Sequence, residues 1–180
     1  MIPEKKLVEQ LQNPKEKNAA FGQLVDAYQE RLYWHIRRLV LNHDDADDVV
    51  QNTFVKIFQN INGFKGESQL YSWMYRIATN EALNFIKSNA KKQTISSQDY
   101  LSLKVEQLQS DVYFDGDEME IKLQQALAQL PEKQRLVFQM KYFDDLKYED
   151  ISEILGTSIG ALKANYHHAV AKIKGFLTED

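Results

Sequence analysis

Apolar residues recur at steps of three and four along most of the chain, which is the spacing of one face of an α-helix. The run Asn13-Pro14-Lys15-Glu16 combines a capping residue, an early proline and a glutamate, as the start of a helix does. Gly and Pro, which interrupt helices, occur only 7 and 3 times. The pattern predicts an all-α fold, with helices over about 13–42, 44–60, 69–87, 119–130, 131–142, 148–155 and 159–176.

The apolar spacing is lost over residues 93–118, which are rich in Ser, Gln and Asp. Between Asp99 and Glu120 there are seven acidic residues and one basic residue, Lys104. Polar segments with one sign of charge bury too little apolar surface to fold alone. We therefore predict two small helical domains, residues 1–92 and 119–180, joined by a flexible acidic linker, residues 93–118.

Composition narrows the class of protein. The 180 residues are 43% hydrophobic and 27% charged, which suits one or two small globular domains. The absence of cysteine excludes disulfides and thiolate metal sites. No apolar signal segment follows Met1 and no run of about 18 apolar residues occurs, so we expect a cytoplasmic protein without membrane insertion. The net charge of −4 argues against indiscriminate binding to nucleic acid.

Residues 148–169 have the pattern of a helix-turn-helix. Gly156 stands where the first helix must end, and Ser158 is placed to cap the second. The second helix has a predicted buried face of Leu162, Tyr166, Ala169 and Ile173, and an opposite face of Gly160, Lys163, Ala164, His167 and Ala171. Small residues and cations suit a helix that enters the major groove of DNA. A helical hairpin with a solvated face has the same pattern and is the alternative.

Charge supports the first interpretation, because residues 159–174 contain three lysines and no acid, whereas residues 143–155 contain five acids and one lysine. The pair His167-His168 does not indicate a metal site, since adjacent helical side chains point about 100° apart. The chain also lacks the Glu-x-x-His motif of di-iron bundles. We predict no metal and no cofactor.

The predicted helix over 44–60 begins with four aspartates, which suit the positive end of a helix dipole. Its outer line is acidic at one end and apolar at the other: Asp44, Asp48, Gln51, Val55 and Phe58. Such a strip fits docking against a basic helix of another protein. Binding of Mg²⁺ is the weaker alternative, because carboxylates on one helical turn do not converge on an ion.

The helix predicted from residue 69 is rich in aromatic and basic side chains, with four cations and one acid over residues 70–92. Aromatic rings beside cations suit the stacking of single-stranded bases. We expect Trp73 and Ile77 to lie in the core. Tyr71 and Tyr75 share a different face and could be exposed.

Together these residues resemble a bacterial sigma factor of the sigma-70 family, in the extracytoplasmic-function (ECF) group with two folded domains. The resemblance covers residues 18–176, and its order and spacing are more specific than any one motif. The motifs are Asp45-Ala46-Asp47-Asp48-Val49-Val50-Gln51-Asn52-Thr53-Phe54, Phe64-Lys65-Gly66-Glu67-Ser68, Trp73-Met74-Tyr75-Arg76-Ile77-Ala78-Thr79-Asn80, Leu130-Pro131 and Gly160-Ala161-Leu162-Lys163.

The resemblance implies a non-enzymatic protein that binds core RNA polymerase, recognises the −35 and −10 promoter elements and melts DNA. Its partners would be the polymerase β′ clamp helices and β flap, promoter DNA and an anti-sigma factor. The polymerase contacts would be Asp47, Asp48, Gln51, Asn52, Val55 and Phe58.

The resemblance also implies two sets of DNA contacts. The −10 element would meet Phe64, Lys65, Gly66, Glu67, Ser68, Gln69, Tyr71, Tyr75 and Asn80. The −35 element would meet Lys141, Ser158, Gly160, Lys163, Ala164, His167 and His168. Three positions differ from the residues usual in the family: Lys147, Ala161 and Asn165. These differences affect which promoter sequence is expected, and they leave the assignment to the family unchanged. A stand-alone helix-turn-helix regulator that binds duplex DNA without polymerase is the alternative.

Overall fold

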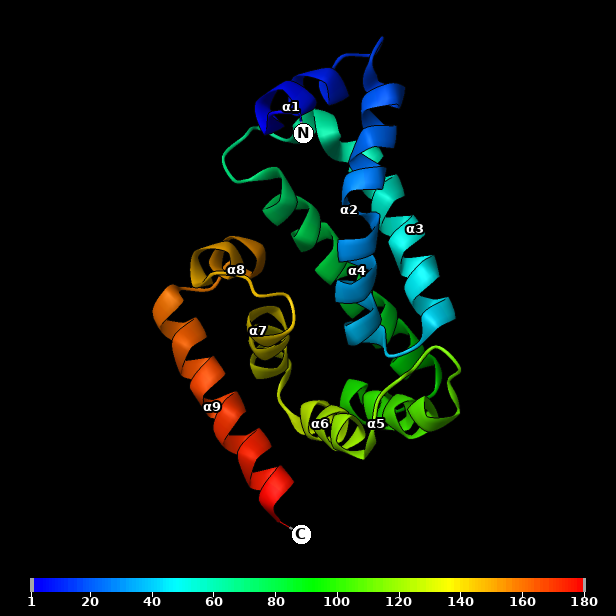
Figure 1. The fold of residues 1–180 in the computed structure, drawn as a ribbon, viewed down its shortest axis with the longest axis vertical. Coiled ribbons are helices and arrows are strands. Elements are labelled where there is room, and N and C mark those ends of the chain that lie inside the picture. The colour runs from blue at the N-terminus through cyan, green and yellow to red at the C-terminus, as the bar shows by residue number, and fades with distance from the viewer. Residues whose placement is uncertain (1, 180) are drawn as a thin grey trace.

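The computed structural model describes residues 2–179, and the fold of this part of the chain is entirely helical, as predicted (Figure 1). Its elements are α1 (Glu4–Gln12), α2 (Lys17–Val40), α3 (His43–Asn60), the 3₁₀ helix η1 (Ile61–Gly63), α4 (Leu70–Lys92), α5 (Ser97–Gln107), the 3₁₀ helix η2 (Leu108–Ser110), α6 (Glu118–Gln129), α7 (Glu132–Tyr142), α8 (Tyr148–Leu155) and α9 (Ile159–Thr178). The predicted domains 1–92 and 119–180 also include residues 1 and 180, which lie outside the described residues.

The N-terminal half is a bundle in which α2, α3 and α4 pack on one another and α1 lies across one end (Figure 1). Leu32, Ile36 and Ile57 are fully buried in its core. Each such side chain contributes about 1.5–3 kcal/mol through removal of apolar surface from water. Asn42 caps α3 by accepting a hydrogen bond from the Asp45 amide at 2.9 Å, so the acidic first turn is held at a defined helix end.

The C-terminal half contains the predicted helix-turn-helix, formed by α8 and α9. Gly156 ends α8 with φ of 66°, a left-handed conformation that glycine adopts at no steric cost. Ser158 caps α9, because its hydroxyl accepts a hydrogen bond from the Ala161 amide at 3.3 Å. Lys147 gives α8 no such side-chain cap.

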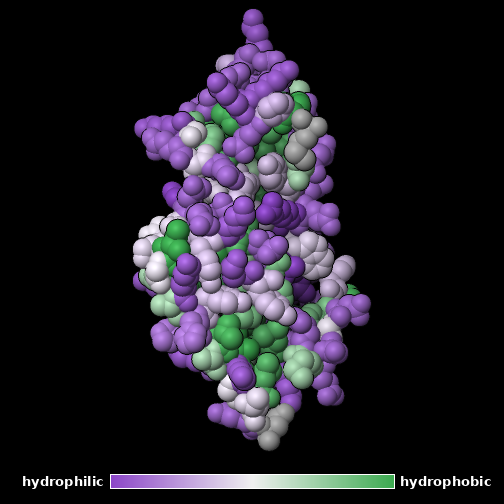
Figure 2. Space-filling view, turned by 60° about the vertical axis from the view of Figure 1, so that its left-hand side comes forward, coloured by the Kyte–Doolittle hydropathy of each residue, from purple (hydrophilic) through white to green (hydrophobic). Residues whose placement is uncertain are grey.

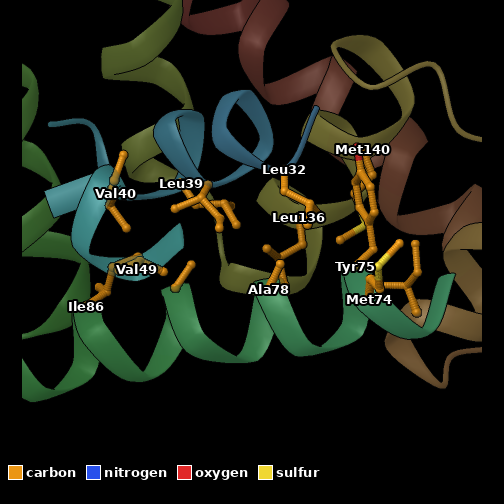
Figure 3. Packing of buried hydrophobic residues seen from close by; sticks show 14 of the residues in the cluster. Leu32, Leu39, Val40, Val49, Met74, Tyr75, Ala78, Ile86, Leu136 and Met140 are labelled. Carbon is orange, nitrogen blue, oxygen red and sulfur yellow. The ribbon is translucent and has the colours of Figure 1, made fainter. Parts of the chain in front are cut away.

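The two halves pack against each other, with α8 beside α4 (Figure 1). Figure 3 shows Leu136 and Met140 of α7 in the same buried layer as Leu32 of α2 and Ala78 and Tyr75 of α4. Gln139 also donates a hydrogen bond of 3.1 Å to the backbone carbonyl of Arg38. The main hydrophobic core therefore continues from one half into the other.

The acidic segment 93–118 contains more regular structure than predicted, because α5 and η2 lie within it. Ser96 caps α5, and the buried residues of the segment are Tyr100, Leu101, Val105 and Leu108. These four side chains follow helical spacing, but the polar residues between them conceal the stripe. The sequence pattern assigned no helix to residues 97–107, and α5 corrects this, whereas flexibility of the linker stays a prediction.

Candidate functional site

The outer face of α9 carries the residues that the sequence assigns to duplex DNA. Ser158, Gly160, Lys163, Ala164, His167 and His168 are all exposed, whereas Leu162, Ala169 and Ile173 are buried. The predicted division between a buried and an exposed face is therefore confirmed for these residues, while Tyr166, which was also predicted to be buried, is half-buried. Figure 2, which is turned toward the side of α8 and α9, shows a mainly hydrophilic surface with a hydrophobic patch low on the molecule and smaller hydrophobic groups higher up.

Two lysines of the predicted DNA contact set approach one aromatic ring at the base of the helix-turn-helix. The Nζ atoms of Lys141 and Lys163 lie 5.0 Å and 5.8 Å from the ring centroid of Tyr148. Lys141 also donates a hydrogen bond of 3.2 Å to the Leu146 carbonyl. Burial raises the pKa of Tyr148 from 10.0, so the ring stays neutral between the cations. The arrangement concentrates positive charge around the start of the helix-turn-helix.

The loop over residues 64–69 connects η1 to α4. Lys65, Gly66, Glu67 and Gln69 are exposed, and Gly66 has φ of 72°, in the left-handed region. Phe64 is different, because it is buried with its ring centroid 5.4 Å from that of Trp73. Phe64 thus packs beneath the loop and exposes only 7% of its surface in this arrangement.

The structure does not leave Tyr71 and Tyr75 both open to solvent on the face that they share. Tyr75 is fully buried with its ring 4.7 Å from that of His35, and Tyr71 is half-buried. Burial, followed by the negative charge of Asp144, raises the pKa of Tyr75 to about 12. Burial and the Asp150 carboxylate of α8 raise the pKa of Tyr71 to about 12. Helical spacing identified a shared face of α4, but not that the C-terminal half covers it.

Trp73 and Ile77 are only half-buried, although both pack against the main core. Asn80 is exposed and borders a cleft of about 410 Å³ between α4, α7 and the turn between α8 and α9. Across this contact, the guanidinium of Arg76 donates a hydrogen bond to the backbone carbonyl of Glu153 in α8. The helix assigned to the −10 element therefore faces the helix-turn-helix assigned to the −35 element.

The strip on α3 has the predicted acidic-to-apolar order on the surface. Asp47, Asp48, Gln51, Asn52 and Val55 are exposed, and Phe58 is half-buried. Beside it, α2 and α3 form a groove of about 550 Å³ lined by Phe21, Val25, Val50, Phe54, Val55 and Phe58. Val55 is 53% exposed, and the rings of Phe21 and Phe58 meet edge to face at 5.0 Å. This surface is chemically suited to an amphipathic partner helix.

Among residues 2–179, no group of three or more His, Cys, Asp or Glu side chains is arranged to hold a metal ion. The rings of His167 and His168 have their centroids 6.0 Å apart. None of the helices over the described range has the length and apolar character needed to span a bilayer.

Known proteins share this arrangement of sequence and fold. Family models for sigma-70 region 2 and for sigma-70, region 4 match residues 24–92 and residues 120–173. The ECF RNA polymerase sigma-E factor of Haemophilus influenzae is 31% identical over 176 residues, which cover 93% of this chain and 92% of that protein. The chain belongs to the ECF group of the sigma-70 family. This sigma factor is also 29% identical over 174 residues to the RNA polymerase sigma-H factor of Pseudomonas aeruginosa, over 92% of this chain and 89% of that protein.

Solved structures agree on the fold of the sigma factor. CnrH, solved in complex with the cytosolic domain of CnrY, superposes with a TM-score of 0.72 at 21% identity over 98% of both chains. The sigma factor RpoE of Bartonella quintana, solved in complex with the anti-sigma factor NepR, gives a TM-score of 0.66 at 22% identity over 89% of this chain and 98% of that chain. The predicted two-part helical fold of a sigma factor is thereby confirmed.

Sequence reasoning missed two features that shape the sites. The first is α1, whose nine residues lie against the loop 64–69. The second is the polar contact between the halves, which depends on pairs of residues far apart in the sequence. The helix α1 could have been predicted from the helical spacing of its apolar residues Leu7, Val8 and Leu11 among charged and polar residues. No local signal indicates the contact between the halves.

Proposed function

We propose that this sigma factor binds core RNA polymerase through α3, reads the −35 element with α9 and reads the −10 element with the loop 64–69 and α4. The observation that carries the proposal is that two suitable surfaces are exposed at once. One is the acidic-to-apolar strip on α3, and the other is the cationic outer face of α9. The protein acts without chemistry of its own, in the cytoplasm where core polymerase works.

The α3 strip is proposed to dock on the β′ clamp helices. Asp47, Asp48, Gln51 and Asn52 supply charge and hydrogen bonds at the acidic end. Val55 and Phe58 supply apolar anchors beside the groove of about 550 Å³. Anchors of this kind, surrounded by polar contacts, carry most of the binding energy at protein interfaces. The C-terminal half is proposed to bind the β flap.

The −35 element is proposed to bind the exposed face of α9 in the major groove. Lys163, Ala164, His167 and His168 face base edges and phosphates, while Ser158 and Gly160 bring the helix N-terminus to the backbone. Lys141 stands beside this face because of its contact with Tyr148. The contribution of each good base contact is about 1–3 kcal/mol of discrimination.

The −10 element is proposed to be read as an extruded single strand. Lys65, Gly66, Glu67, Ser68 and Gln69 form the loop that would hold a flipped base. Extrusion costs a few kcal/mol per base, and stacking contributes about 1–3 kcal/mol in return. Phe64 supports the loop from within, and Tyr71, Tyr75 and Asn80 lie along α4 on the side that α8 now faces.

This function requires the two halves to separate. The −35 and −10 positions lie about 25 base pairs apart, which is roughly 85 Å of duplex at 3.4 Å per base pair. In the present structure α8 touches α4, so the two reading surfaces cannot span that distance. Binding to polymerase would favour the open arrangement by contacting each half at its own site.

An anti-sigma factor is a further proposed partner. The sigma factors of similar fold include one solved with the anti-sigma factor NepR. The α3 groove, with its exposed Val55, offers apolar surface that such a partner would cover in competition with polymerase.

Run-off transcription with purified core polymerase tests the proposal. The chain is added to core enzyme on a pool of bacterial promoter fragments, and transcripts are mapped by sequencing. We expect transcripts only when both proteins are present, with start sites downstream of a shared pair of −35 and −10 motifs. Tight binding of the free chain to a defined duplex, without transcripts, would instead favour the stand-alone regulator.

A further inference from the structure

The side-chain amide of Gln12, at the end of α1, holds the turn from which the loop 64–69 begins. Its Nε2 donates hydrogen bonds to the backbone carbonyls of Ile61 at 3.0 Å and Phe64 at 2.8 Å, across 49 and 52 residues of sequence. The Ile61 carbonyl also accepts a hydrogen bond of 3.1 Å from the Phe64 amide, so Gln12 joins the bond that closes η1. Gln12 therefore fixes η1 and the first residue of the loop with a single amide group.

Glu4, at the other end of α1, holds the far end of the same loop. Its carboxylate accepts a hydrogen bond of 3.0 Å from the backbone amide of Leu70, the first residue of α4. Gln69, the N-cap residue of α4, provides no side-chain cap. Glu4 thus serves as a cap supplied from another helix, and its negative charge is favourable at the positive end of the α4 dipole.

Both contacts come from one face of α1. Glu4, Val8 and Gln12 follow one another at steps of four, and they line a groove of about 390 Å³ together with Phe64, Lys65 and Ser68. Leu11, which lies beside this face and is fully buried, fixes α1 to the bundle. Hence α1 connects the rigid bundle to the loop.

The middle of the loop has little other support. Within residues 2–179, no hydrogen bond from another element reaches Lys65, Gly66 or Glu67. The Ser68 hydroxyl bonds only to its neighbour, the Gln69 carbonyl, at 3.4 Å. The shape of the loop therefore depends on how its two ends are held, and on the anchor Phe64.

We propose that α1 positions the −10 reading loop, with Glu4 and Gln12 as positioning residues that set selectivity for the extruded base. The inference rests on the proposed function of the loop. Glu4 and Gln12 touch the loop backbone rather than the DNA, so they act by limiting the conformations in which Lys65, Glu67 and Ser68 meet a base. Precise placement of such side chains is what discrimination between bases requires.

The test measures −10 discrimination by the complete holoenzyme. Core polymerase is assembled with wild-type chain, Glu4→Ala, Gln12→Ala, Glu4→Gln or the control Lys6→Ala, which alters an exposed residue of the same helix. Open-complex formation is measured on a promoter identified by run-off transcription and on versions with single −10 or −35 substitutions. We expect Glu4→Ala and Gln12→Ala to lower −10 discrimination about fivefold to tenfold, and to leave −35 discrimination and core affinity unchanged.

In Glu4→Gln the side-chain amide oxygen can still accept the hydrogen bond from the Leu70 amide. We therefore expect the logarithm of the −10 discrimination ratio to be at least half of the wild-type value. Lys6→Ala should match wild type. A purely structural α1 would instead lower the melting temperature of both alanine variants with −10 discrimination unchanged, and that result overturns the inference. Glu4 is exposed, so Glu4→Ala gives a decisive result even if Gln12→Ala does not fold. Wild-type holoenzyme that ignores −10 substitutions would contradict the proposed function itself.

Discussion

The imidazole Nδ1 of His35 lies 2.7 Å from a carboxylate oxygen of Asp144, 109 residues further along the chain. The two side chains are only 1% and 5% exposed. The second oxygen of Asp144 accepts a hydrogen bond of 3.1 Å from Arg38, and His35 Nε2 lies 2.8 Å from the Thr79 hydroxyl. A carboxylate from the C-terminal half is thus enclosed by polar groups of the N-terminal half, which links the two halves in a closed arrangement.

Replacing this carboxylate should open the molecule. Asp144→Asn removes the charge that Arg38 and His35 face, and hydrogen bonds to a charged group are worth about 1.5–3 kcal/mol. A loss of about 2 kcal/mol shifts the ratio of closed to open molecules roughly 30-fold. Small-angle X-ray scattering of the free protein should show a larger radius of gyration for Asp144→Asn than for wild type.

Asp145→Asn is the matched control for this prediction. It removes the same charge from the neighbouring, exposed residue, whose φ of 51° asparagine tolerates. Its radius of gyration should equal that of wild type. An unchanged radius for Asp144→Asn, or an equal increase in both variants, would show that the buried carboxylate does not hold the halves together.

Reversing charge on the α3 strip should weaken polymerase binding. Asp48→Arg puts a cation into an exposed surface proposed to meet a basic partner, where like charges cost several kcal/mol. We expect the affinity for core polymerase to fall roughly 30-fold or more, measured by fluorescence anisotropy of labelled chain. Glu106→Arg makes the same change on the exposed side of α5 and should leave the affinity near wild type. Equal affinities for both variants would remove α3 from the interface.

Reversing charge on α9 should abolish recognition of the −35 element. Lys163→Glu places an anion on the proposed DNA face, whereas Lys172→Glu makes the same change nine residues later, about 180° around the helix. In a footprint of the holoenzyme, Lys163→Glu should lose protection at −35, and Lys172→Glu should retain it. The affinity of the holoenzyme for a duplex with the −35 element should fall roughly 10-fold to 100-fold with Lys163→Glu. If both variants behave alike, α9 contributes general charge rather than a reading face.

Local signals in the sequence predicted the helix-turn-helix well. Gly156 and Ser158 each determine a helix end through their own backbone and side chain, without reference to distant residues. The exposed acidic-to-apolar strip on α3 was likewise predictable, because helical spacing decides which side chains share a face of the helix. The helix α5 was missed since its buried Tyr100 and Val105 stand among acidic and polar residues that dominate the composition.

Contacts between residues far apart in the sequence could not be predicted from local sequence patterns. Periodicity placed Tyr71 and Tyr75 on one face of α4, but tertiary packing, which includes His35 of α2 against the Tyr75 ring, decides that Tyr75 is buried. The hydrogen bond between His35 and Asp144 joins two polar residues 109 positions apart in the sequence. Nothing in the residues around either one predicts that the two side chains meet. The same holds for Glu4 and Leu70, since a cap supplied by another helix has no spacing rule.

Gly156 should be intolerant of a side chain for conformational reasons alone. Its φ of 66° lies in the left-handed region, while a Cβ added there would meet nothing within 4 Å. Gly156→Ala should therefore lower the free energy of unfolding by about 1–2 kcal/mol, measured by urea denaturation. Gly22→Ala is the control, because Gly22 is helical, also has free space and should gain up to about 1 kcal/mol. A neutral Gly156→Ala would mean that the turn relaxes without cost.

Tyr75 offers a spectroscopic test of the closed arrangement. Its folded pKa, about 12, is raised above the ordinary value of 10.0 first by burial and then by the charge of Asp144. The folded state therefore favours the neutral phenol, and the stability this gives is complete below pH 10 and is lost as the pH rises toward 12. The phenolate absorbance that distinguishes wild type from Tyr75→Phe should appear near pH 12 in folded protein and near pH 10 in urea. Asp144→Asn should lower the folded value by removing a negative charge and part of the burial, with circular dichroism confirming that the helices persist. Ionisation near pH 10 in the native wild type would show that α7 and the segment after it do not cover Tyr75 in solution.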